Sequence, residues 1–593
     1  MNLIWLIGSL LLASVSCLNT HRHLWKKITE SLNTKNVREP HNKLYSLPMD
    51  DNGKFELKWT PLFNEEKVVF LLKAQLSKKS WIGIGFSDYG NLTGSDLCFY
   101  WEDWRGRGHM QDTRVLENGT LVVDDQQDCE GFQYSRHNNS LLLTFTRKWI
   151  TCDPKDYKIE DGTVHVTYVT GPGPLFSLDG INVKDENHGF QRTRLLQVNG
   201  DEQEDSQYFD VLSNNAVIPP KETTYWCRVQ KIPEVFKDKH HVIQFEANIQ
   251  AENEGVVHHI EVFYCEVAET ANLPLYSGPC DGTERPQTTQ ACKRVIAAWA
   301  MGAGPFSYPK EAGQTFGGSS FSRYIMLEVH YNNPRLKKGI VDNSGIRLYY
   351  TKKLRKHDAG IIELGLEYTD KMAIPPLQEE FVLSGYCVPE CTAVGLPQNG
   401  ITVFGSQLHT HLTGKRVMTR HIRNGRELPP LNQDLHYSPH FQEIRLLREP
   451  VNVLPGDSLI TSCWYDTTHR KNVTLGGFSI SDEMCVNYIH YYPKADLEVC
   501  KSSVSDQKLN DYFEFINSWE DQPTDTSRAI SENYRAISWT PLRAKLLDDF
   551  YTHSAISMQC NKSDGNRFPG VWEGMNNVWP KLQVLDEDTN CEG

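Results

Sequence analysis

The sequence predicts a mostly β protein built from several domains in tandem. Short runs rich in β-branched and aromatic residues recur along the chain, bounded by Gly, Asn and Asp. Residues 216–515 show no long helical periodicity. The 593 residues also exceed what one hydrophobic core can hold, and the length suggests three to four domains.

Residues 1–17 are typical of a secretory signal peptide. An apolar stretch from Leu3 to Leu12 runs into small residues that end at Cys17. The basic start of a signal peptide is missing, so a retained anchor is the alternative, although the stretch is short for crossing a bilayer. No other segment approaches transmembrane length. We expect a soluble protein of the secretory pathway, secreted or held in the lumen of the endoplasmic reticulum or of a secretory vesicle.

Composition indicates the compartment and excludes one class of partner. Cleavage after Cys17 leaves fourteen of the fifteen cysteines, enough for seven disulfides in an oxidising compartment. The net charge of −14 argues against a nucleic-acid partner. Five sequons are compatible with glycosylation, although chance alone supplies a few. Their acceptors are Asn91, Asn118, Asn138, Asn472 and Asn561.

Residues 40–175 predict a first β-sandwich. Four strand-like runs are separated by turn residues, and the breaker Gly171-Pro172-Gly173-Pro174 marks the end of the domain. An acidic connector near residues 200–205 follows. The four runs are Phe55–Trp59, Val68–Leu72, Trp81–Phe86 and Leu141–Phe145.

The strand-and-turn pattern resumes in two further blocks, residues 206–369 and 370–515, and predicts two more β-sandwiches. Residues 516–593 differ from them. Within this last part, Arg543–Tyr551 predicts a helical turn or two before a tail with two cysteines. The sequence therefore predicts three β domains and a short, partly helical tail.

His409 and His411 form the most informative motif. A strand through Gln407–Leu412 puts both imidazoles on one face, with Leu408 and Leu412 on the other. Solvated histidines on a polar strand face are the alternative. Met484 offers a thioether, which Cu(I) accepts readily and zinc, magnesium and calcium rarely do, although a buried methionine usually fills a core.

A second set of histidines lies earlier in the chain. His258 and His259 are adjacent, so both can bind one metal only at a bulge or at a strand end. His330 lies in a strong strand pattern, where a lone histidine is more often a hydrogen-bonded core residue. The competing pair His240-His241 lies in a charged stretch and predicts a solvated loop.

These motifs resemble the copper type II, ascorbate-dependent monooxygenases from about residue 45 onward. In that family a DOMON module comes first and two jelly-roll-like copper domains follow. The resemblance therefore implies a DOMON domain over 40–175, copper domains over 206–369 and 370–515, and a tail over 516–593. The matching segments are Thr151–Tyr157, Ile159–His165, Thr224–Cys227, Val257–His259, Leu327–Tyr331, Ser406–Gly414 and Glu483–Pro493.

The resemblance implies two copper ions per chain, with ascorbate as electron donor and O2 as co-substrate. One site stores and passes an electron, and the other, which includes His409, binds O2 and hydroxylates the substrate. Tyr225 matches a tyrosine assigned to the active site of one branch, although core packing explains it equally well. The implied ligands are His258, His259 and His330 for the first site and His409, His411 and Met484 for the second.

The resemblance also implies six disulfides. The two cysteines left over, Cys98 and Cys129, lie in one domain, and we predict that they pair. A disulfide at Cys485 would hold its neighbour Met484 in place. The implied pairs are Cys152–Cys591, Cys227–Cys280, Cys265–Cys292, Cys387–Cys500, Cys391–Cys560 and Cys463–Cys485.

Gln407 bears on the substrate. The peptide-amidating branch has an arginine here that grips a carboxylate, and glutamine lacks that bidentate cation. The segment Cys485–Pro493 resembles the phenethylamine branch instead. The implied reaction is hydroxylation of the benzylic carbon of an arylethylamine, with dopamine or tyramine as leading substrate.

One departure keeps other functions open. Tetrameric members of that branch carry a Cys-x-Cys segment for interchain bridges, but residues 518–526 hold no cysteine. A non-covalent homodimer stays compatible with this, as does a paralogue with another small-molecule substrate. A non-catalytic copper-binding or interaction protein is a further alternative. A zinc hydrolase is disfavoured because no His-Glu-x-x-His motif is present.

Overall fold

The computed structural model describes residues 44–577 and Cys591, apart from gaps at 51, 179, 199, 201–205, 269–270, 302, 320 and 480. The signal peptide expected over 1–17 and the acidic connector at 201–205 lie outside the described residues. Those from Tyr45 onward belong to one compact unit. Within the described ranges, no helix is both long and apolar enough to cross a bilayer. The mostly β fold class predicted from the sequence is confirmed.

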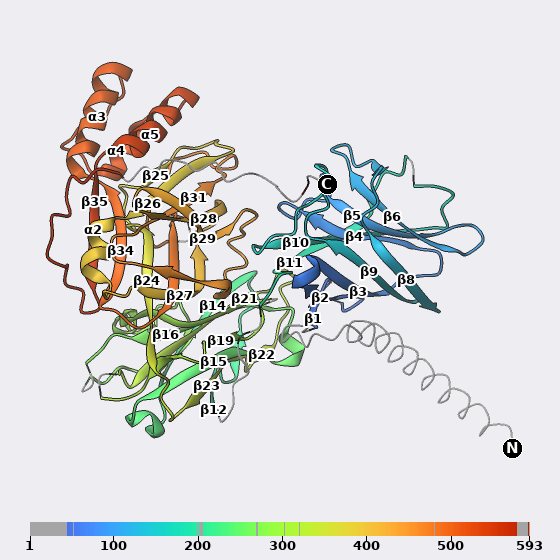
Figure 1. The fold of residues 1–593 in the computed structure, drawn as a ribbon, viewed down its shortest axis with the longest axis horizontal. Helices are drawn as coiled ribbons and strands as arrows, with labels where there is room; N and C mark the ends of the chain where they lie inside the picture. Colours follow the sequence, from blue (N-terminus) through green and yellow to red (C-terminus); the bar gives the residue numbers. More distant parts are fainter. Residues whose placement is uncertain are drawn as a thin grey trace. The chain divides into compact units, whose positions relative to one another are not determined.

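The first domain is a sandwich of two antiparallel sheets, drawn in blue to teal in Figure 1. In β3, Val68, Phe70, Leu72 and Ala74 are buried at every second position, which gives the sheet an apolar inner face. One sheet comprises β1 (Tyr45–Pro48), β2 (Phe55–Leu62), β3 (Lys67–Gln75), β9 (Ser140–Lys148) and β8 (Glu130–His137). The other comprises β11 (Asn187–Thr193), β10 (Val164–Gly171), β4 (Trp81–Ser87), β5 (Asp96–Glu102), β6 (Gly108–Val115) and β7 (Leu121–Val123), and the helical turn η1 is Phe63–Glu65.

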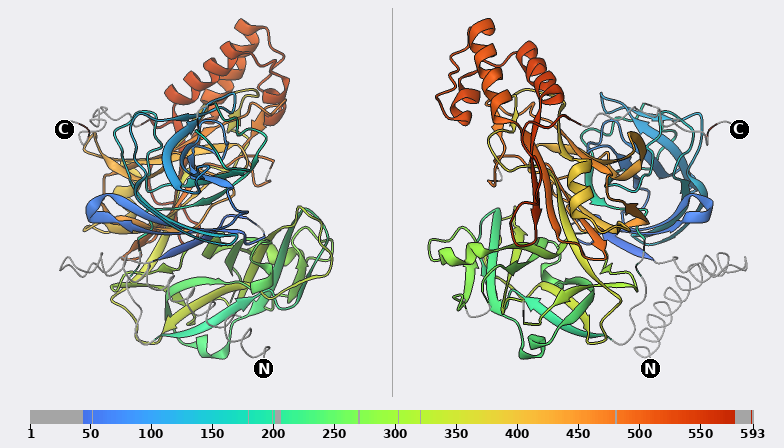
Figure 2. Two further views of the ribbon diagram at one scale, coloured as in Figure 1. Left: turned by 90° about the vertical axis from the view of Figure 1, so that its right-hand side faces the viewer. Right: turned by 60° about the vertical axis from the view of Figure 1, so that its left-hand side comes forward.

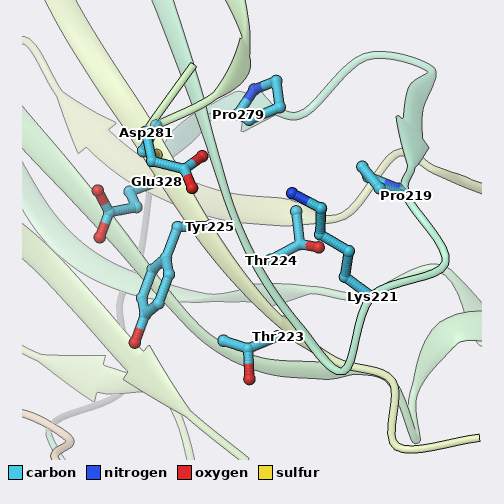
Figure 3. Close-up of a pocket in the computed structure, with 9 residues that line it drawn as sticks. Pro219, Lys221, Thr223, Thr224, Tyr225, Pro279, Asp281 and Glu328 are labelled. Carbon is cyan, nitrogen blue, oxygen red and sulfur yellow. The ribbon is translucent and has the colours of Figure 1, made fainter. Parts of the chain in front are cut away.

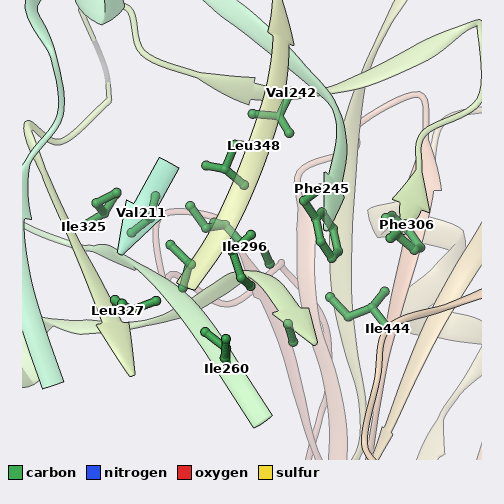
Figure 4. Close-up of a cluster of buried hydrophobic side chains, with 14 of the residues drawn as sticks. Val211, Val242, Phe245, Ile260, Ile296, Phe306, Ile325, Leu327, Leu348 and Ile444 are labelled. Atoms are coloured by element: carbon green, nitrogen blue, oxygen red, sulfur yellow. The ribbon is translucent and has the colours of Figure 1, made fainter. Parts of the chain in front are cut away.

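The second domain packs a five-stranded sheet against part of an eleven-stranded one. Figure 4 shows the core between them, which includes Ile260 and Leu327 of the five-stranded sheet and Leu348 of the opposing strands. The five-stranded sheet comprises β17 (Tyr276–Pro279), β14 (Thr223–Lys231), β21 (Tyr324–Asn332), β16 (Val257–Cys265) and β18 (Cys292–Ala300). The opposing strands are β12 (Gln207–Leu212), β23 (Gly345–Thr351), β15 (His240–Asn248), β19 (Phe306–Ser307) and β20 (Ala312–Phe316). The remaining elements are β13 (Ala216–Ile218), β22 (Ile340–Asp342), η2 (Glu234–Lys237), η3 (Ala251–Asn253) and η4 (Gln287–Ala291).

The eleven-stranded sheet continues into the third domain, because β20 pairs in parallel with β24. A four-stranded sheet packs against this half, with Leu459 and Ile460 in the shared core. The continuing strands are β24 (His357–Leu366), β33 (Val486–Tyr492), β27 (Ile401–His409), β30 (Arg445–Val453), β34 (Leu497–Val504) and β35 (Ile556–Lys562). The other elements are β26 (Phe381–Cys387), β31 (Ser458–Tyr465), β28 (Gly414–Arg423), β29 (Arg426–Asp434), β25 (Ala373–Ile374), β32 (Thr474–Leu475) and the helix α2 (Pro389–Gly395).

The C-terminal part is more helical than expected, and it returns to the sheet. The expected turn or two at 543–551 is the helix α5 (Pro541–His553), which follows α3 (Asp506–Glu520) and α4 (Ile530–Ala536). Both views of Figure 2 show these helices side by side, and the rings of Tyr512 and Phe550 stack at 4.7 Å. After α5, β35 pairs with β34. The apolar positions of these helices fill a core, a tertiary effect that composition alone does not show.

The described residues form seven disulfides, and their pairs are those named from the sequence. The longest-range one, Cys152–Cys591, ties the first domain to the C-terminal end across 439 positions. Cys98–Cys129 lies within the first domain. The others are Cys227–Cys280, Cys265–Cys292, Cys387–Cys500, Cys391–Cys560 and Cys463–Cys485.

The expectation of a solvated loop at His240-His241 is wrong. Both residues begin β15 and both are buried. The Nε2 atom of His241 lies 2.8 Å from a carboxylate oxygen of Asp358, and the Nδ1 atom of His240 lies 2.7 Å from the carbonyl oxygen of Asp238. Neighbouring charges suggested exposure, but both rings are buried; both nitrogens of His241 have hydrogen-bond partners, whereas His240 has one at Nδ1 alone among the described residues. Neither residue belongs to a group of potential metal ligands that lie close together in the described part of the chain.

Candidate copper centres

His258, His259 and His330 meet on the outer face of the five-stranded sheet. In β21 the side chains of Leu327 and Val329 enter the core, so His330 projects from the opposite face. His259 lies opposite His330 in register, and the register between β16 and β21 shifts between Val257 and His259. This irregularity at His258 is the bulge that two adjacent histidines need in order to share one metal.

The three rings present Nδ1 atoms to one point. The Nδ1 atom of His259 lies 3.3 Å from that of His258 and 3.3 Å from that of His330. Imidazole nitrogens bound to a metal at about 2 Å are roughly 3–4 Å apart, so the spacing fits one shared ion. Burial and neighbouring imidazoles lower the pKa of His258 to about 3 and hold the pKa of His259 well below its usual value. Neutral rings with free lone pairs are the form that binds copper.

Tyr225 forms a wall beside this cluster. It lies opposite His330 in the register of β14 and β21, and the two rings stack at 4.5 Å with an angle of 7°. Burial and the carboxylates of Glu328 and Glu261 raise the pKa of Tyr225 to about 12. The tyrosine is therefore a neutral phenol in contact with a candidate ligand, and it packs against that ligand's ring as well as within its strand.

His409 and His411 also lie together, although the strand differs from the expectation. β27 ends at His409, and a turn closed by a 3.4 Å hydrogen bond from the Gly414 amide to the His411 carbonyl follows. Leu408 is buried as expected, but Leu412 is 42% exposed because of this turn. The rings of His409 and His411 are nevertheless 5.3 Å apart and nearly perpendicular.

Hydrogen bonds select which nitrogen of each ring is available. The Nδ1 atom of His411 lies 3.0 Å from the Asp482 carbonyl oxygen, which can only accept. The Nδ1 atom of His409 lies 2.5 Å from the side-chain oxygen of Gln442. Each Nδ1 therefore carries the proton, and each Nε2 keeps a lone pair for a metal. Burial and the neighbouring His411 lower the pKa of His409 to about 4.

Hydrogen bonds tie the segment that carries Met484 to the turn that carries His411. The buried carboxylate of Glu483 accepts hydrogen bonds from the amides of His411 at 2.8 Å and Thr413 at 2.6 Å, which ties the Met484 segment to the His409–His411 turn. The hydroxyl of Tyr465 donates to the Met484 carbonyl at 2.8 Å. Two Nε2 donors with a thioether, 7% exposed, form a set suited to copper and poor for zinc.

The connection between β29 and β30 reaches both clusters. Gln442 accepts from His409, the hydroxyl of Tyr437 accepts from the Thr410 amide at 3.0 Å, and the ring of His440 lies 5.8 Å from that of His258. These residues were not predicted from the sequence, because a connecting segment has no periodicity that marks them. The one sequence feature that could have drawn attention to them is the close spacing of polar and aromatic residues in Tyr437–Gln442.

Gln407 faces a carboxylate rather than presenting a cation. Its amide group donates to the Gln442 carbonyl at 2.9 Å, and it hydrogen-bonds the carboxyl of Glu261 on β16. Burial and the neighbouring Glu328 raise the pKa of Glu261 to about 8. The hydrogen bond from Gln407 acts in the opposite direction and lowers this pKa. The region next to the His-x-His motif thus holds buried acidic groups, which no sequence pattern marks.

The sequon asparagines are mostly accessible. Asn91, Asn118, Asn138 and Asn472 are exposed, whereas Asn561 lies half-buried in β35. The side-chain oxygen of Asn561 is buried and has no hydrogen-bond partner among the described residues. The first four side chains are therefore accessible, and Asn561 is the least suited acceptor of the five.

Comparison with known proteins agrees with this arrangement. Family models match for the DOMON domain over residues 51–171, and for the N-terminal and C-terminal domains of copper type II ascorbate-dependent monooxygenases over 209–338 and 357–513. Dopamine beta-hydroxylase of Homo sapiens is 46% identical over 546 residues, which cover 91% of this chain and 87% of the relative. Tyramine beta-hydroxylase of Caenorhabditis briggsae is 37% identical (86% and 87% covered), and DBH-like monooxygenase protein 1 of Homo sapiens is 35% identical (88% and 86% covered). The chain belongs to the copper type II ascorbate-dependent monooxygenase family.

Proposed function

We propose that this enzyme hydroxylates the benzylic carbon of an arylethylamine such as dopamine or tyramine. As a family member it is a copper- and ascorbate-dependent monooxygenase. The reaction inserts one atom of O2 into the carbon–hydrogen bond and reduces the other to water, with two electrons from ascorbate and two protons. The relatives named for dopamine and tyramine support this substrate class.

The observation that carries the proposal is the difference between the two donor sets. The first offers three neutral nitrogens through Nδ1, a set suited to storing an electron, and the second offers two Nε2 atoms and a thioether, a set suited to holding Cu(I). Bound copper supplies the one-electron chemistry with O2 that side chains lack. The chain's own residues fix the ring tautomers and bury the donors.

The surroundings of Gln407 favour an amine over a carboxylate substrate. Gln407 offers no cation to a substrate carboxylate, and its side chain is hydrogen-bonded to the buried carboxyl of Glu261 instead. The lack of a cation at position 407 supports an arylethylamine and opposes a peptide that ends in a carboxylate.

The first test is a substrate panel with purified, copper-loaded full chain. With ascorbate and air, tyramine, dopamine and phenethylamine should each give a β-hydroxylated product with one O2 consumed per product, and an acyl-glycine peptide should give none. Product is identified by mass spectrometry. Absence of turnover with every amine would refute the proposal.

Met484→Ile separates catalysis from a binding role. The variant keeps an apolar side chain of similar volume but removes the sulfur, so hydroxylation should fall by more than the roughly 10–100-fold that changes around a ligand set cost. The melting temperature and the copper content of the three-histidine site should stay as in the parent protein. Full activity of this variant would contradict the assigned oxygen site.

The seven disulfides and the relatives indicate a protein of the secretory pathway. We further propose that residues 1–17 are a cleaved signal peptide and that the mature enzyme is secreted or stored in a vesicle. N-terminal sequencing of protein secreted from expressing cells should begin near residue 18. A start at Met1 would instead support a retained anchor.

A further inference from the structure

His440 is a fourth imidazole beside the three-histidine cluster, the group formed by His258, His259 and His330. Its ring lies 5.8 Å from that of His258 and is perpendicular to it. A charge on the His440 ring would lower the pKa of every histidine in the cluster, so the ring lies near all three. The cluster belongs to the second domain, whereas His440 lies in the third, in the connection between β29 and β30.

The spacing of the four rings is compatible with one shared ion. A ring that binds a metal through nitrogen at about 2 Å has its centre about 3 Å from the metal, so the centres of two such rings lie at most about 6 Å apart. The centres within the cluster are 4.6, 4.9 and 5.5 Å apart, and the distance of 5.8 Å between His440 and His258 stays within that limit. The nitrogens of His440 lie outside the group of ligand atoms within 4.8 Å of one another, so coordination requires this side chain to turn.

The surroundings of His440 hold its backbone and leave its ring free to turn. The His440 amide donates to the Ser438 hydroxyl at 3.3 Å, and the Phe441 amide donates to the Ser438 carbonyl at 3.0 Å. Phe441 is buried and anchors the segment. The His440 side chain is exposed, and neither ring nitrogen has a hydrogen-bond partner among the described residues. Both lone-pair positions of this ring therefore remain available.

Tyr225 covers another side of the cluster. Its ring stacks on His330 at 4.5 Å and also lines a pocket of about 420 Å³ (Figure 3). The described residues that line this pocket include no histidine and no methionine. No further imidazole or thioether is thus available on the Tyr225 side. A fourth nitrogen donor has to come from the side of the β29–β30 connection, where His440 lies.

The two oxidation states of copper differ in their need for a fourth donor. Cu(II) favours four donors in a tetragonal arrangement, whereas Cu(I) accepts fewer. The cluster presents three Nδ1 atoms to one point. Three nitrogens complete the surroundings of Cu(I) but leave Cu(II) one donor short.

We propose that His440 is a fourth ligand of the first copper ion when that ion is Cu(II), and that it leaves when the ion is reduced. One electron from ascorbate converts Cu(II) to Cu(I), the bond between the metal and the His440 nitrogen breaks, and that nitrogen regains its lone pair. The assignment goes beyond the proposed hydroxylation, because it depends on the copper of the family and not on which amine reacts.

Such an exchange of ligands reaches the second site through Gln442. The Gln442 amide group donates at 2.6 Å to the carbonyl of Pro439, the residue directly before His440. The side-chain oxygen of Gln442 lies 2.5 Å from the Nδ1 atom of His409. Coordination of His440 therefore fixes the segment that selects the tautomer of His409. The oxidation state of the first ion is in this way linked to the order of the second site.

Counting the ligands is the first test. Full chain carrying His411→Ala and Met484→Ile, which disable the second site, serves as parent and is loaded with one equivalent of Cu(II). Pulsed EPR should detect four coordinated imidazoles in the parent and three after the further change His440→Ala. Added imidazole should alter the Cu(II) signal of the His440→Ala protein alone, because only there is the fourth position open.

Affinity separates a ligand from a mere neighbour. In competition with chelators for each oxidation state, His440→Ala should weaken Cu(II) binding by about 10–100-fold and leave Cu(I) binding nearly unchanged. The matched control is His469→Ala, an exposed histidine of the same domain, which should change neither affinity. Copper-free His440→Ala should melt at the temperature of the parent, because the exposed ring makes no hydrogen bond that the change would remove.

Hydrogen exchange tests the link to Gln442. Amides of residues 438–443 should exchange more slowly in the Cu(II) parent than in the Cu(I) parent, and at equal rates in the two states of His440→Ala. Mass spectrometry of peptides from this segment gives the comparison. Equal exchange in both states of the parent would contradict the proposal.

Three further outcomes would overturn the assignment. They are three imidazoles in the Cu(II) parent, equal weakening of Cu(II) and Cu(I) binding by His440→Ala, and binding of added imidazole to the parent as readily as to that variant. A chain that hydroxylates no amine but shows four imidazoles and a selective loss of Cu(II) affinity would refute the proposed substrate and leave this assignment standing.

Discussion

At the scale of single residues, the hydrogen bond that each histidine ring makes through one nitrogen decides which nitrogen is left for the metal. Gln442 and the Asp482 carbonyl each take an Nδ1 proton, so His409 and His411 present Nε2. In the other cluster Nδ1 atoms lie together at 3.3 Å. The two candidate centres therefore differ in donor atom as well as in donor element, and this difference supports the proposed division between oxygen chemistry and electron storage.

Gln442→Leu tests this control at the oxygen site. Without its acceptor, the His409 ring is free to change tautomer, so copper affinity at this site or hydroxylation should fall by about 10–100-fold. Competition with a Cu(I) chelator measures the affinity. The three-histidine site should keep its copper, and equal loss from both sites would mean that the variant disturbs the fold rather than the tautomer.

At the scale of elements, the segment before β33 is fixed from three directions. Glu483 binds the turn after β27, Tyr465 of β31 donates to the Met484 carbonyl, and Cys485 is bonded to Cys463 of β31. A methionine side chain is flexible, so its sulfur stays near the histidines only if the backbone is held. The neighbouring strands supply that rigidity.

Removing the Cys463–Cys485 bond, with a matched control, tests whether this disulfide keeps Met484 bound to copper in addition to stabilising the fold. The double Ser variant should lose roughly 3 kcal/mol of unfolding free energy and also the sulfur signal in the X-ray absorption spectrum of the Cu(I) protein. The matched control is the double Ser variant of Cys98 and Cys129, which closes a loop of similar length in the first domain. That control should lose comparable stability yet keep the sulfur signal; loss in both would make Met484 ligation a general effect of destabilisation.

At the scale of the whole molecule, the DOMON domain contacts the segment that serves both copper centres. Thr163 donates its amide at 3.1 Å and its hydroxyl at 2.6 Å to the buried carboxylate of Asp434, at the end of β29. The rings of Tyr157 and His436 lie 5.0 Å apart, and Arg194 donates to the Leu446 carbonyl at 3.5 Å. The β29 end of the β29–β30 connection thus contacts DOMON residues, and the start of β30 contacts Arg194, which directly follows β11.

Thr163→Val should loosen that connection from a distance. The lost hydroxyl leaves Asp434 short of one donor at a cost of about 1–2 kcal/mol, so amides of residues 435–444 should exchange faster and hydroxylation should decline. Mass spectrometry of hydrogen exchange follows the segment. Thr113→Val, which removes a buried hydroxyl within the DOMON sheets, is the control and should leave the segment unchanged.

The six candidate ligands were proposed from the family resemblance, because the local patterns alone also allowed solvated or core histidines and a core methionine. His-x-His, an adjacent pair and a methionine beside a cysteine carry their chemistry within a few residues. Gln442, His440 and Glu261 were not predictable, because their roles arise when distant strands meet. The buried pair His240-His241 shows the converse: local charge suggested solvent, and the hydrogen bonds to Asp358 and Asp238 decided otherwise.

The Cys152–Cys591 bond makes most of the polypeptide a covalent ring. A single proteolytic cut between these two cysteines opens the ring without releasing either piece, so a nicked enzyme keeps its DOMON module and both histidine clusters in one molecule. On a non-reducing gel the nicked protein would stay at full mass, and reduction would reveal the fragments. The disulfide between those cysteines therefore lets an enzyme that encounters proteases outside the cytosol tolerate a single cleavage of the chain.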